Sequence, residues 1–544
     1  MISLVLFVLA IIPLVILFPH VRKRIKQSTL RNVPGPASES FWAGATRRMH
    51  GPLCVPFREQ TLTSYGRAIN IPTRLGDLDL AVSDPVALSA MFTTYREAYD
   101  LPRWNSDTMR SVFGPGLTSV RGKEHIRHRK QLNPVFSVRY LKEMVPTFNR
   151  VAQELIGVLR EKTTAPRTEI DVSQYFSRYT LESVGRAALG TSFGSLGAED
   201  GTDYSRALKE FGPTIVKLHP WRPLLPWLRR TFPLSFLQWA TGVLPWPALR
   251  HMRAISDSVY STSQQVLRRK KDMLKHGGDS LAREVGEGKD LMSVLLQQNM
   301  LSSPDAMSED DMIGHMSLLL LAATDTTSTS ITRAIEVLAQ HPEAQAKLRQ
   351  ELLDATAGTG RTLADFDYDT YTNLPYLEAV VRETVRMYPS FHLSPRVAEQ
   401  DTVLPLGTPI QGTDGRTITE LVVPAHTMVW VNILGLNRDK AIWGPDAHEW
   451  KPERWLGQLP ASVADAHIPN VFSNTMTFVA GPRSCIGYNM ALTEMRIALA
   501  HLVLAFEFAP SDKEIIWRLG GVVSPSVKGS TSKKPEFPVV ISRV

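Results

Sequence analysis

The first stretch of the chain is almost wholly apolar. Between residues 2 and 18 only a serine and a proline interrupt the hydrophobic side chains, and this length lies at the lower limit of the ~17–25 residues that cross the hydrocarbon core of a bilayer. Met1 leads directly into the run and basic residues follow it at positions 22–26, whereas a cleaved signal peptide normally carries its positive charge in front. We predict an uncleaved transmembrane anchor over residues 1–20, with the remainder of the chain on the cytosolic side. A cleaved signal peptide is the competing interpretation.

A proline-rich segment follows the anchor. The sequence Asn32-Val33-Pro34-Gly35-Pro36 fixes the φ angle twice around a glycine and therefore redirects the chain. We predict a basic, proline-rich hinge over residues 21–40. Residues 41–544 contain no linker and no internal repeat, and we predict that they form one domain. Within it, a weak alternation of apolar and polar residues between Thr73 and Ser83 predicts strands of a small β-region.

A long helix is predicted in the second half of the chain. Ser308 and the acids after it form an N-cap signature, and no proline occurs from there to about Gln340. The segment is apolar through four leucines at 318–321 and then reads Ala-Ala-Thr-Asp-Thr-Thr over residues 322–327. Polar groups at the centre of an apolar helix require a reason. One structural reason is that each threonine bonds back to a carbonyl one turn earlier, Thr326 to that of residue 322.

Three other segments have a sequence pattern that is compatible with a purely structural role or with a functional one. Residues 121–130 are strongly basic, which is typical of a solvated helical face. Residues 377–387 are amphipathic and contain a Glu-x-x-Arg pair, which on an exposed helix contributes little. The tryptophan-rich region 221–246 is apolar and interrupted by prolines. It is either buried core or a flap that touches a membrane over a substrate entrance, and we prefer the flap because tryptophan favours the headgroup level.

Composition narrows the class of protein. A hydrophobic fraction of 43% over 544 residues is ordinary for a globular chain with a large core. The formal charge of +8 suits an anionic membrane surface or an acidic protein partner. We find no nucleic-acid motif, so nucleic acid is not expected as a partner. The two cysteines, Cys54 and Cys485, offer no disulfide framework, which favours a catalytic domain in a reducing compartment.

Candidate chemistry is concentrated around Cys485. It lies in the stretch 478–487, which reads Phe-Val-Ala-Gly-Pro-Arg-Ser-Cys-Ile-Gly, just before a helical run from Tyr488 to Leu504. The unpaired N–H groups and the positive end of a helix favour a thiolate, which can ligate iron. Glycines on both sides of the cysteine would let the backbone approach a flat ligand closely. A buried structural cysteine is the alternative for an isolated Cys-x-Gly.

The complete pattern Phe-x-x-Gly-x-Arg-x-Cys-x-Gly resembles the haem-binding loop of the cytochrome P-450 superfamily, the haem-thiolate monooxygenases. The resemblance implies a heme b cofactor with Cys485 as its axial thiolate and metal ligand. It further implies that Arg483 contacts a haem propionate, that Phe478 packs near the sulfur, and that Gly487 belongs to the haem-binding loop.

Two further arginine positions match the family. Its Trp-x-x-x-Arg motif directs both side chains at a propionate, and this chain has His125 in the first place and Arg129 in the second. A histidine can also donate a hydrogen bond. Ser394-Pro395-Arg396 matches the position of another propionate-binding arginine, so Arg396 is expected to bind haem as well.

The oxygen-binding motif of the family, Ala/Gly-Gly-x-Asp/Glu-Thr, matches the centre of the predicted long helix. Ala322 then borders the cofactor, and Ala323 replaces the usual glycine. The resemblance assigns Thr326 to the binding of dioxygen and Asp325 to the relay of protons from solvent.

The Glu-x-x-Arg pair gains significance from the same resemblance. Glu383 and Arg386 match a family motif that adds a second arginine from a Pro-Glu-Arg element, which is present here with Arg454. Two arginines would satisfy a buried carboxylate and brace the loop that leads to Cys485. This triad is expected to be structural.

The resemblance implies a mainly α fold with a small β-region and an activity on a lipophilic small molecule. Nothing in the chain resembles a flavin or nicotinamide fingerprint, so electrons would come from an NADPH–cytochrome P-450 reductase, with cytochrome b5 as a further candidate partner. The basic side chains of Lys123, Arg127 and Lys130 could dock such a donor.

The chain is similar to fungal microsomal members of specialised metabolism, which suggests a terpenoid or related substrate and the endoplasmic reticulum membrane. Three alternatives remain open: a haem-fold isomerase or dehydratase of peroxides, a membrane-anchored hydrolase with Cys485 as nucleophile, and a non-catalytic haem-binding protein.

Overall fold

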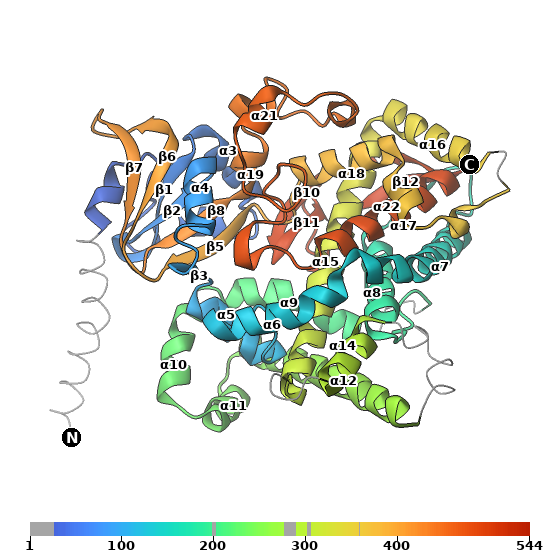
Figure 1. The fold of residues 1–544 in the computed structure, drawn as a ribbon, viewed down its shortest axis with the longest axis horizontal. Helices are drawn as coiled ribbons and strands as arrows, with labels where there is room; N and C mark the ends of the chain where they lie inside the picture. Colours follow the sequence, from blue (N-terminus) through green and yellow to red (C-terminus); the bar gives the residue numbers. More distant parts are fainter. Residues whose placement is uncertain (1–26, 198–202, 277–289, 302–305, 358–359) are drawn as a thin grey trace. The chain divides into compact units, whose positions relative to one another are not determined.

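The computed structural model describes residues 27–197, 203–276, 290–301, 306–357 and 360–544. The chain divides into two compact units. The first unit contains the described part of Met1–Pro102 together with Phe391–Glu449 and Pro460–Ser484, and the second contains Arg103–Ser390, Trp450–Leu459 and Cys485–Val544. Most of their helices and strands are labelled in Figure 1. The mainly helical fold with a small β-region that the sequence predicts is confirmed.

The predicted anchor at residues 1–20 lies outside the described residues, as does the first part of the predicted hinge. Among the helices that the structure describes, none combines the length and the apolarity needed to cross a bilayer. The proline-rich segment 32–36 packs closely on a neighbouring strand: the Asn70 N–H donates to the Pro34 carbonyl at 2.9 Å. A Cβ on Gly35 would lie 1.8 Å from the Asn70 carbonyl oxygen, so only glycine fits this approach.

A mixed five-stranded sheet is the centre of the first unit. Its strand order is β1-β2-β8-β5-β3, with β2 and β8 parallel and the other neighbours antiparallel. A buried apolar cluster that includes Met49, Ile69 and Trp430 packs against it. The strand predicted within 73–83 begins at Leu78, because the chain first turns through a 3₁₀ segment. The strands are β1 (Ala68–Pro72), β2 (Leu78–Val82), β3 (Tyr99–Asp100), β5 (Leu393–Ala398) and β8 (Met428–Asn432).

Short helices and a hairpin complete the first unit. Strands β6 and β7 pair antiparallel, with a register shift between Pro405 and Ile410. The remaining elements are η1 (Gln27–Asn32), α2 (Thr46–His50), α3 (Val55–Ser64), η2 (Arg74–Gly76), α4 (Pro85–Phe92), β6 (Thr402–Gln411), β7 (Thr417–Val423), α19 (Ile433–Asn437), α20 (Lys440–Trp443), α21 (Ala461–Asp465) and η7 (Gly481–Arg483).

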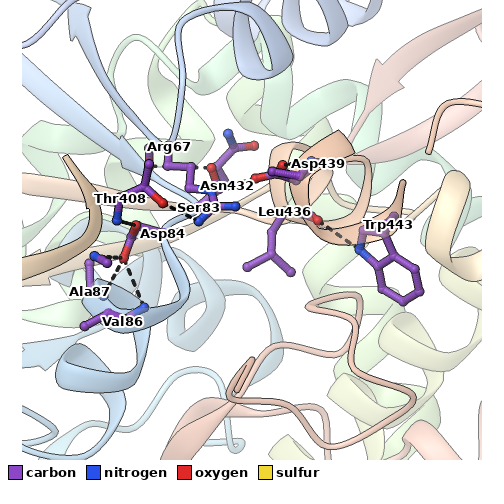
Figure 2. Close-up of polar contacts among 12 residues, drawn as sticks. Arg67, Ser83, Asp84, Val86, Ala87, Thr408, Asn432, Leu436, Asp439 and Trp443 are labelled. Atoms are coloured by element: carbon purple, nitrogen blue, oxygen red, sulfur yellow. Dashed lines mark hydrogen bonds and ion pairs between the residues drawn. The ribbon is translucent and has the colours of Figure 1, made fainter. Parts of the chain in front are cut away.

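A buried carboxylate joins α4 to the hairpin (Figure 2). Asp84 is the N-cap of α4, and its Oδ1 accepts hydrogen bonds from the Val86, Ala87 and Gly407 N–H groups while its Oδ2 accepts from that of Thr408. Nearby, Arg67 donates to Asp439 Oδ2 at 2.7 Å and to Thr408 Oγ1 at 2.7 Å. A cap that satisfies several backbone donors fixes the start of α4 and the edge of the hairpin together.

The long helix α15 (Glu309–Gln340) is the central element of the second unit, and its bounds agree with the sequence prediction. Ser308 and Asp311 form a capping box at its start. Most of its length is buried, and α8 and α22 pack against it (Figure 1). The other helices are α5 (Arg103–Phe113), α6 (Gly122–Leu132), η3 (Asn133–Phe136), α7 (Val138–Lys162), α8 (Ser173–Leu189), α9 (Asp203–Leu218), η4 (Arg222–Leu224), α10 (Leu225–Thr231), α11 (Leu234–Val243), α12 (Pro247–His276), α14 (Leu291–Leu301), α16 (Pro342–Thr356), η5 (Leu363–Asp365), α17 (Tyr368–Thr372), α18 (Pro375–Met387), η6 (Pro452–Trp455) and α22 (Tyr488–Ala505).

Two small sheets finish the second unit. One has the order β4-β12-β9 and the other is the hairpin β10-β11, which turns at Gly521 with φ of +99°. A Cβ on Gly212 of α9 would lie 1.8 Å from the Gly520 carbonyl oxygen, so this hairpin turn packs directly on α9. The strands are β4 (Thr168–Asp171), β9 (Phe506–Pro510), β10 (Ile515–Gly520), β11 (Val522–Val527) and β12 (Pro538–Arg543).

The tryptophan-rich region 221–246 forms η4, α10 and α11, and its aromatic side chains are exposed. Trp221, Trp227 and Trp239 are 55%, 59% and 60% exposed. The interpretation of this region as buried core is therefore wrong. Large exposed apolar surfaces usually mark an interaction site.

Candidate active site

Cys485 lies three residues before Tyr488, the first residue of α22, as the sequence predicts. The side chain is accessible, although protein surrounds it closely. Burial raises the pKa of the thiol, while a backbone hydrogen bond from Gly487 and the charge of Arg129 act in the opposite direction. The expectation that the helix start alone favours the thiolate is wrong for the free side chain, because desolvation outweighs both favourable effects. A bound cation would reverse that balance.

The segment before the cysteine has unusual backbone conformations. Val479 has φ of 57° and Gly481 has φ of 69°, and for a β-branched residue such as valine this region is strained. A Cβ on Gly481 would also lie 3.1 Å from the Phe92 side chain. Phe478 is half-buried and packs edge to face on Phe472, with the ring centroids 5.9 Å apart. Strain of this kind clusters at functional sites.

Gly487 is the N-cap of α22 and has a negative φ of −98°. A Cβ there would make only an ordinary contact, 3.7 Å from the Phe136 ring. The described protein atoms therefore leave room for a side chain at Gly487. A planar group bound against the loop would give the absence of a side chain a physical reason.

One face of α15 is accessible at the centre of an otherwise buried helix. Ala322 is exposed and Leu319, Ala323 and Thr326 are half-buried. These positions follow the i, i+3, i+4, i+7 spacing of a single helix face. The Thr326 hydroxyl donates to the Ala322 carbonyl at 2.7 Å, which is the back-bond expected from the sequence. That bond occupies the hydroxyl proton, while the oxygen lone pairs remain available as acceptors.

Asp325 is enclosed in the protein beside α9. Burial raises the pKa of its carboxyl to about 6, and the positive charge of Lys209 acts to lower it. Burial also lowers the pKa of Lys209 to about 8, and the Lys209 ammonium donates to Gln174 Oε1 at 2.5 Å. Lys209 was missed by the sequence reasoning because nothing local to α9 marks it as the neighbour of an acid 116 positions away.

The basic helix α6 presents two different faces. His125 is buried, whereas Lys123 and Lys130 are exposed. The Arg129 Nε donates to Asn133 Oδ1 at 3.1 Å, and burial lowers the pKa of Arg129 while the nearby Cys485 raises it. The second unit therefore brings Arg129 close to the cysteine sulfur.

The first unit brings Arg396 and Arg483 close together. Arg483 forms an ion pair with Asp100 at 2.6 Å. Arg396 is 2% exposed, and its Nη1 donates to Ser394 Oγ and to the Pro395 carbonyl. Its Nη2 has no hydrogen-bond partner among the described residues. Burial, together with the charge of Arg483, lowers the pKa of Arg396 to about 10. A carboxylate ligand would satisfy this buried donor and offset the excess positive charge.

Glu383, Arg386 and Arg454 meet as the sequence motif anticipates. Arg386 holds the Glu383 carboxylate bidentately at 2.8 and 2.7 Å, and Arg454 Nε lies 3.3 Å from Oε1. Trp455 Nε1 and the Lys451 N–H also donate to this carboxylate. Glu383 and Arg386 are both 0% exposed. The sequence did not reveal the last two donors, because they come from residues flanking Arg454 and not from a recognised motif position.

The residues in each unit fit parts of a haem. The second unit offers an accessible cysteine, a loop glycine that no protein atom requires to be glycine, and an accessible helix face that carries the Thr326 hydroxyl. The first unit offers an unpartnered arginine N–H that calls for a carboxylate, and propionates are carboxylates. A haem needs a ligand for its iron, room for its flat ring and partners for its propionates. The cysteine, the open helix face and the arginine match these three needs.

Comparison with known proteins agrees with this reading. The profile described as Cytochrome P450 matches residues 82–531. The chain is 38% identical to cytochrome P450 monooxygenase 91 of Postia placenta over 518 residues, which cover 95% of this chain and 94% of that one. It is 37% identical to ganoderic acid synthetase CYP5150L8 of Ganoderma lucidum, covering 94% and 93%, and 35% identical to the cytochrome P450 monooxygenase eriI of Hericium erinaceus, covering 94% of each.

The relatives cover almost the whole chain, and the family match over residues 82–531 spans the positions of the cysteine loop and of the long helix. Members of the matched family use a haem-thiolate cofactor, dioxygen, an organic substrate and a redox partner. The chain belongs to the cytochrome P450 family as one of its monooxygenases.

Proposed function

We propose that this enzyme inserts one oxygen atom from dioxygen into a lipophilic small molecule, with a terpenoid or related specialised metabolite as substrate. The name of the Ganoderma lucidum relative, ganoderic acid synthetase, supports a specialised metabolite of that kind. Electrons come from an NADPH–cytochrome P-450 reductase, and cytochrome b5 is a second candidate donor. The enzyme is a single-pass protein of the endoplasmic reticulum membrane with its catalytic domain on the cytosolic side.

One observation carries the proposal. In the second unit, an accessible cysteine at the start of α22 occurs together with an accessible stripe at the middle of α15, a helix that is otherwise buried. Folding normally covers such a stripe, because leaving an apolar helix face in water forgoes about 25 cal/mol per Å². An exposed Ala322 within this helix therefore supports a bound group that covers it in the working enzyme.

The chain's own residues have separate tasks in this proposal. When heme b is bound, Cys485 would supply the thiolate that ligates its iron, and Arg396, Arg129, His125 and Arg483 would hold its propionates. The haem, when bound, supplies the oxygen-activating chemistry. Gly487, Phe478 and Ala322 border the cofactor without bonding to it.

Proton delivery is assigned to α15. The carboxyl of Asp325, with a pKa of about 6, can both hold and release a proton near neutral pH. Thr326 accepts or passes that proton at its hydroxyl oxygen, one residue further along the helix. Lys209 tunes the acid by its charge.

The exposed aromatic surface of α10 and α11 supports contact with a lipid surface. Trp227 and Trp239 carry an apolar ring and one polar N–H each, which suits the headgroup level. Such a surface would let a lipophilic substrate enter from the bilayer. The exposed Lys123 and Lys130 of α6 offer charges for docking an acidic electron donor.

The alternatives are weaker on physical grounds. A thiol nucleophile needs a lowered pKa, whereas burial raises that of Cys485. A peroxide isomerase needs no relay acid, whereas the raised pKa of Asp325 suits one.

Turnover in labelled oxygen tests the proposal. Holoenzyme in lipid vesicles is mixed with reductase, NADPH and ¹⁸O₂, and products from a terpenoid panel are analysed by mass spectrometry. The proposal predicts a product that contains one ¹⁸O atom and that requires both reductase and NADPH. Product formed at the same rate without reductase, or oxygen incorporated from water, would contradict it.

A further inference from the structure

Four side chains with metal-ligand chemistry meet between α6 and α15 in the second unit. Glu124 and His128 come from α6, and Asp311 and His315 come from the first turns of α15. One ligand atom from each of Glu124, His128 and Asp311 lies within 4.8 Å of the other two. His128 is 0% exposed and Asp311 is 8% exposed. Buried groups of this kind are paired or coordinate metals.

The geometry fixes the tautomer of His128. Arg127 Nη2 lies 3.2 Å from His128 Nε2, and a guanidinium can only donate. Nε2 must therefore be the acceptor, which places the ring proton on Nδ1. His128 Nδ1 lies 3.1 Å from His315 Nε2 and donates to it.

This arrangement is the one that metal-binding histidines use. A ligating imidazole coordinates through one nitrogen while the other N–H is held by a neighbouring acceptor, which fixes the ring orientation. Here His315 is that acceptor, with its ring centroid 5.0 Å from that of His128. His128 Nε2, which accepts from Arg127 Nη2, also lies 3.8 Å from Asp311 Oδ1.

The carboxylates of Asp311 and Glu124 each have an oxygen atom that is available to bind a cation. Asp311 uses Oδ2 to accept from the Ser308 N–H in the capping box, which leaves Oδ1 on the side of His128. Glu124 has a half-exposed side chain that can move. Ligands of a bound Zn²⁺ lie about 2.0–2.2 Å from the ion, so a small inward movement of Glu124 would complete the set.

Two arginines now supply the positive charge of the cluster. Arg127 Nη2 lies 3.9 Å from Asp311 Oδ2, and Arg110 Nη1 lies 3.7 Å from Glu124 Oε2. Their side chains are 47% and 40% exposed. Both can swing into water at little cost because each is long, flexible and still partly hydrated. Their partners, Glu124 and Asp311, belong to helices, so the backbone that carries these carboxylates stays in place.

We propose that Glu124, His128 and Asp311 bind a divalent transition cation of the Zn²⁺ class, with His315 orienting His128 and with Arg127 displaced into solvent. The ion would fasten α6 to the start of α15. None of these ligands is among the residues assigned to the haem, and the inference does not depend on the proposed function.

Zinc binding to the haem-loaded protein, prepared without a polyhistidine tag, tests the proposal. Calorimetric titration with Zn²⁺ is expected to show one tight equivalent, and the zinc K-edge absorption spectrum, which does not see haem iron, is expected to show only nitrogen and oxygen ligands. Glu124→Gln and His128→Gln should each weaken binding by about 10–100-fold or more. The control Glu161→Gln, an exposed acid on α7, should leave it unchanged.

The Arg127→Gln change is expected to strengthen zinc binding, in contrast to the changes at Glu124 and His128. Removing the competing cation should raise zinc affinity by roughly threefold or more, since a nearby surface charge contributes up to about 1 kcal/mol. Zinc should also raise the thermal midpoint of the wild type and not that of Glu124→Gln. The proposal is overturned if the wild type binds no tight equivalent, if sulfur appears in the ligand shell, or if Arg127→Gln binds more weakly while the Glu124 and His128 variants bind normally.

Discussion

Two acids of the second unit, one buried and one half-buried, have opposite surroundings. Glu383 is held by Arg386, Arg454, Trp455 and the Lys451 N–H, so its carboxylate is fully bonded. Asp325 is enclosed beside one partly desolvated lysine, and burial raises its pKa to about 6. Both acids lie in helices and both occur in short sequence motifs. Their partners differ: several donors hold the Glu383 carboxylate, whereas the raised pKa of Asp325 lets that acid titrate near neutral pH.

The difference separates structural from chemical roles. A buried charge with complete bonding is costly to disturb and does not exchange protons readily. A carboxyl whose pKa lies near the working pH can change protonation state in each catalytic cycle. One carboxylate therefore holds α18 and η6 together, and the other has the proton affinity that the proposed relay requires.

Removal of the Glu383 charge should have the largest effect. Glu383→Gln leaves two buried arginines without their anion, which typically costs about 3–5 kcal/mol. We expect little haem-containing protein, as measured by the ratio of haem to protein absorbance after purification. The control Glu453→Gln changes a half-exposed acid of the same 3₁₀ helix and should retain haem. Normal haem content in Glu383→Gln would show that the triad is dispensable.

The Asp325→Asn change should preserve the fold and impair turnover. Loss of a positioned proton donor typically costs about 10²-fold or more in rate, and the isosteric amide keeps the packing. We expect normal haem content with product formation reduced about 100-fold.

Thr326→Ala should retain NADPH consumption while diverting it to hydrogen peroxide. Full product yield without extra peroxide in both variants would remove α15 from the proton path.

The pH dependence of stability should identify Asp325 directly. Its folded-state pKa of about 6 lies above the ordinary value of 3.8. The folded state therefore gains stability from the protonated form, fully below about pH 4, and loses it as pH rises through 6. Relative to Asp325→Asn, the wild type should lose about 1–3 kcal/mol of unfolding free energy between pH 4 and 7. The same pH dependence of the free energy of unfolding in both proteins, measured by urea unfolding, would contradict this.

The smallest effect is expected at Lys209. Its charge acts to lower the pKa of Asp325, so Lys209→Gln should move the midpoint of the pH–rate profile upward by a fraction of a unit. The maximal rate at low pH should be unchanged, because the acid itself is intact. A downward shift, or an unchanged midpoint, would mean that Lys209 does not set the proton affinity of Asp325.

The sequence predicted the elements whose signals are local. The capping residues and absence of proline gave the bounds of α15, and the glutamate–arginine spacing together with Pro-Glu-Arg anticipated the contacts of Glu383. Partners from distant parts of the chain were missed. Lys209 beside Asp325 and His315 on His128 depend on which helices pack together, and no local pattern encodes that.

The sign of the pKa shift at Cys485 was also beyond the sequence. The helix start was visible in the pattern, and it does contribute a favourable hydrogen bond from Gly487. The extent of desolvation was not visible, and it is the larger effect. The exposed tryptophans of α10 and α11 illustrate the same limit, since apolar composition alone did not distinguish core from surface.

The central claim is the bond between the Cys485 sulfur and haem iron. The absorption spectrum of the reduced, carbon-monoxide-bound protein tests it most directly, because a thiolate opposite to carbon monoxide shifts the Soret band far to the red. We predict this band for the wild type and its complete loss in Cys485→Ala, with lower iron content. A wild-type protein without colour, or a Cys485→Ala protein with the same band and the same iron content, would contradict the account.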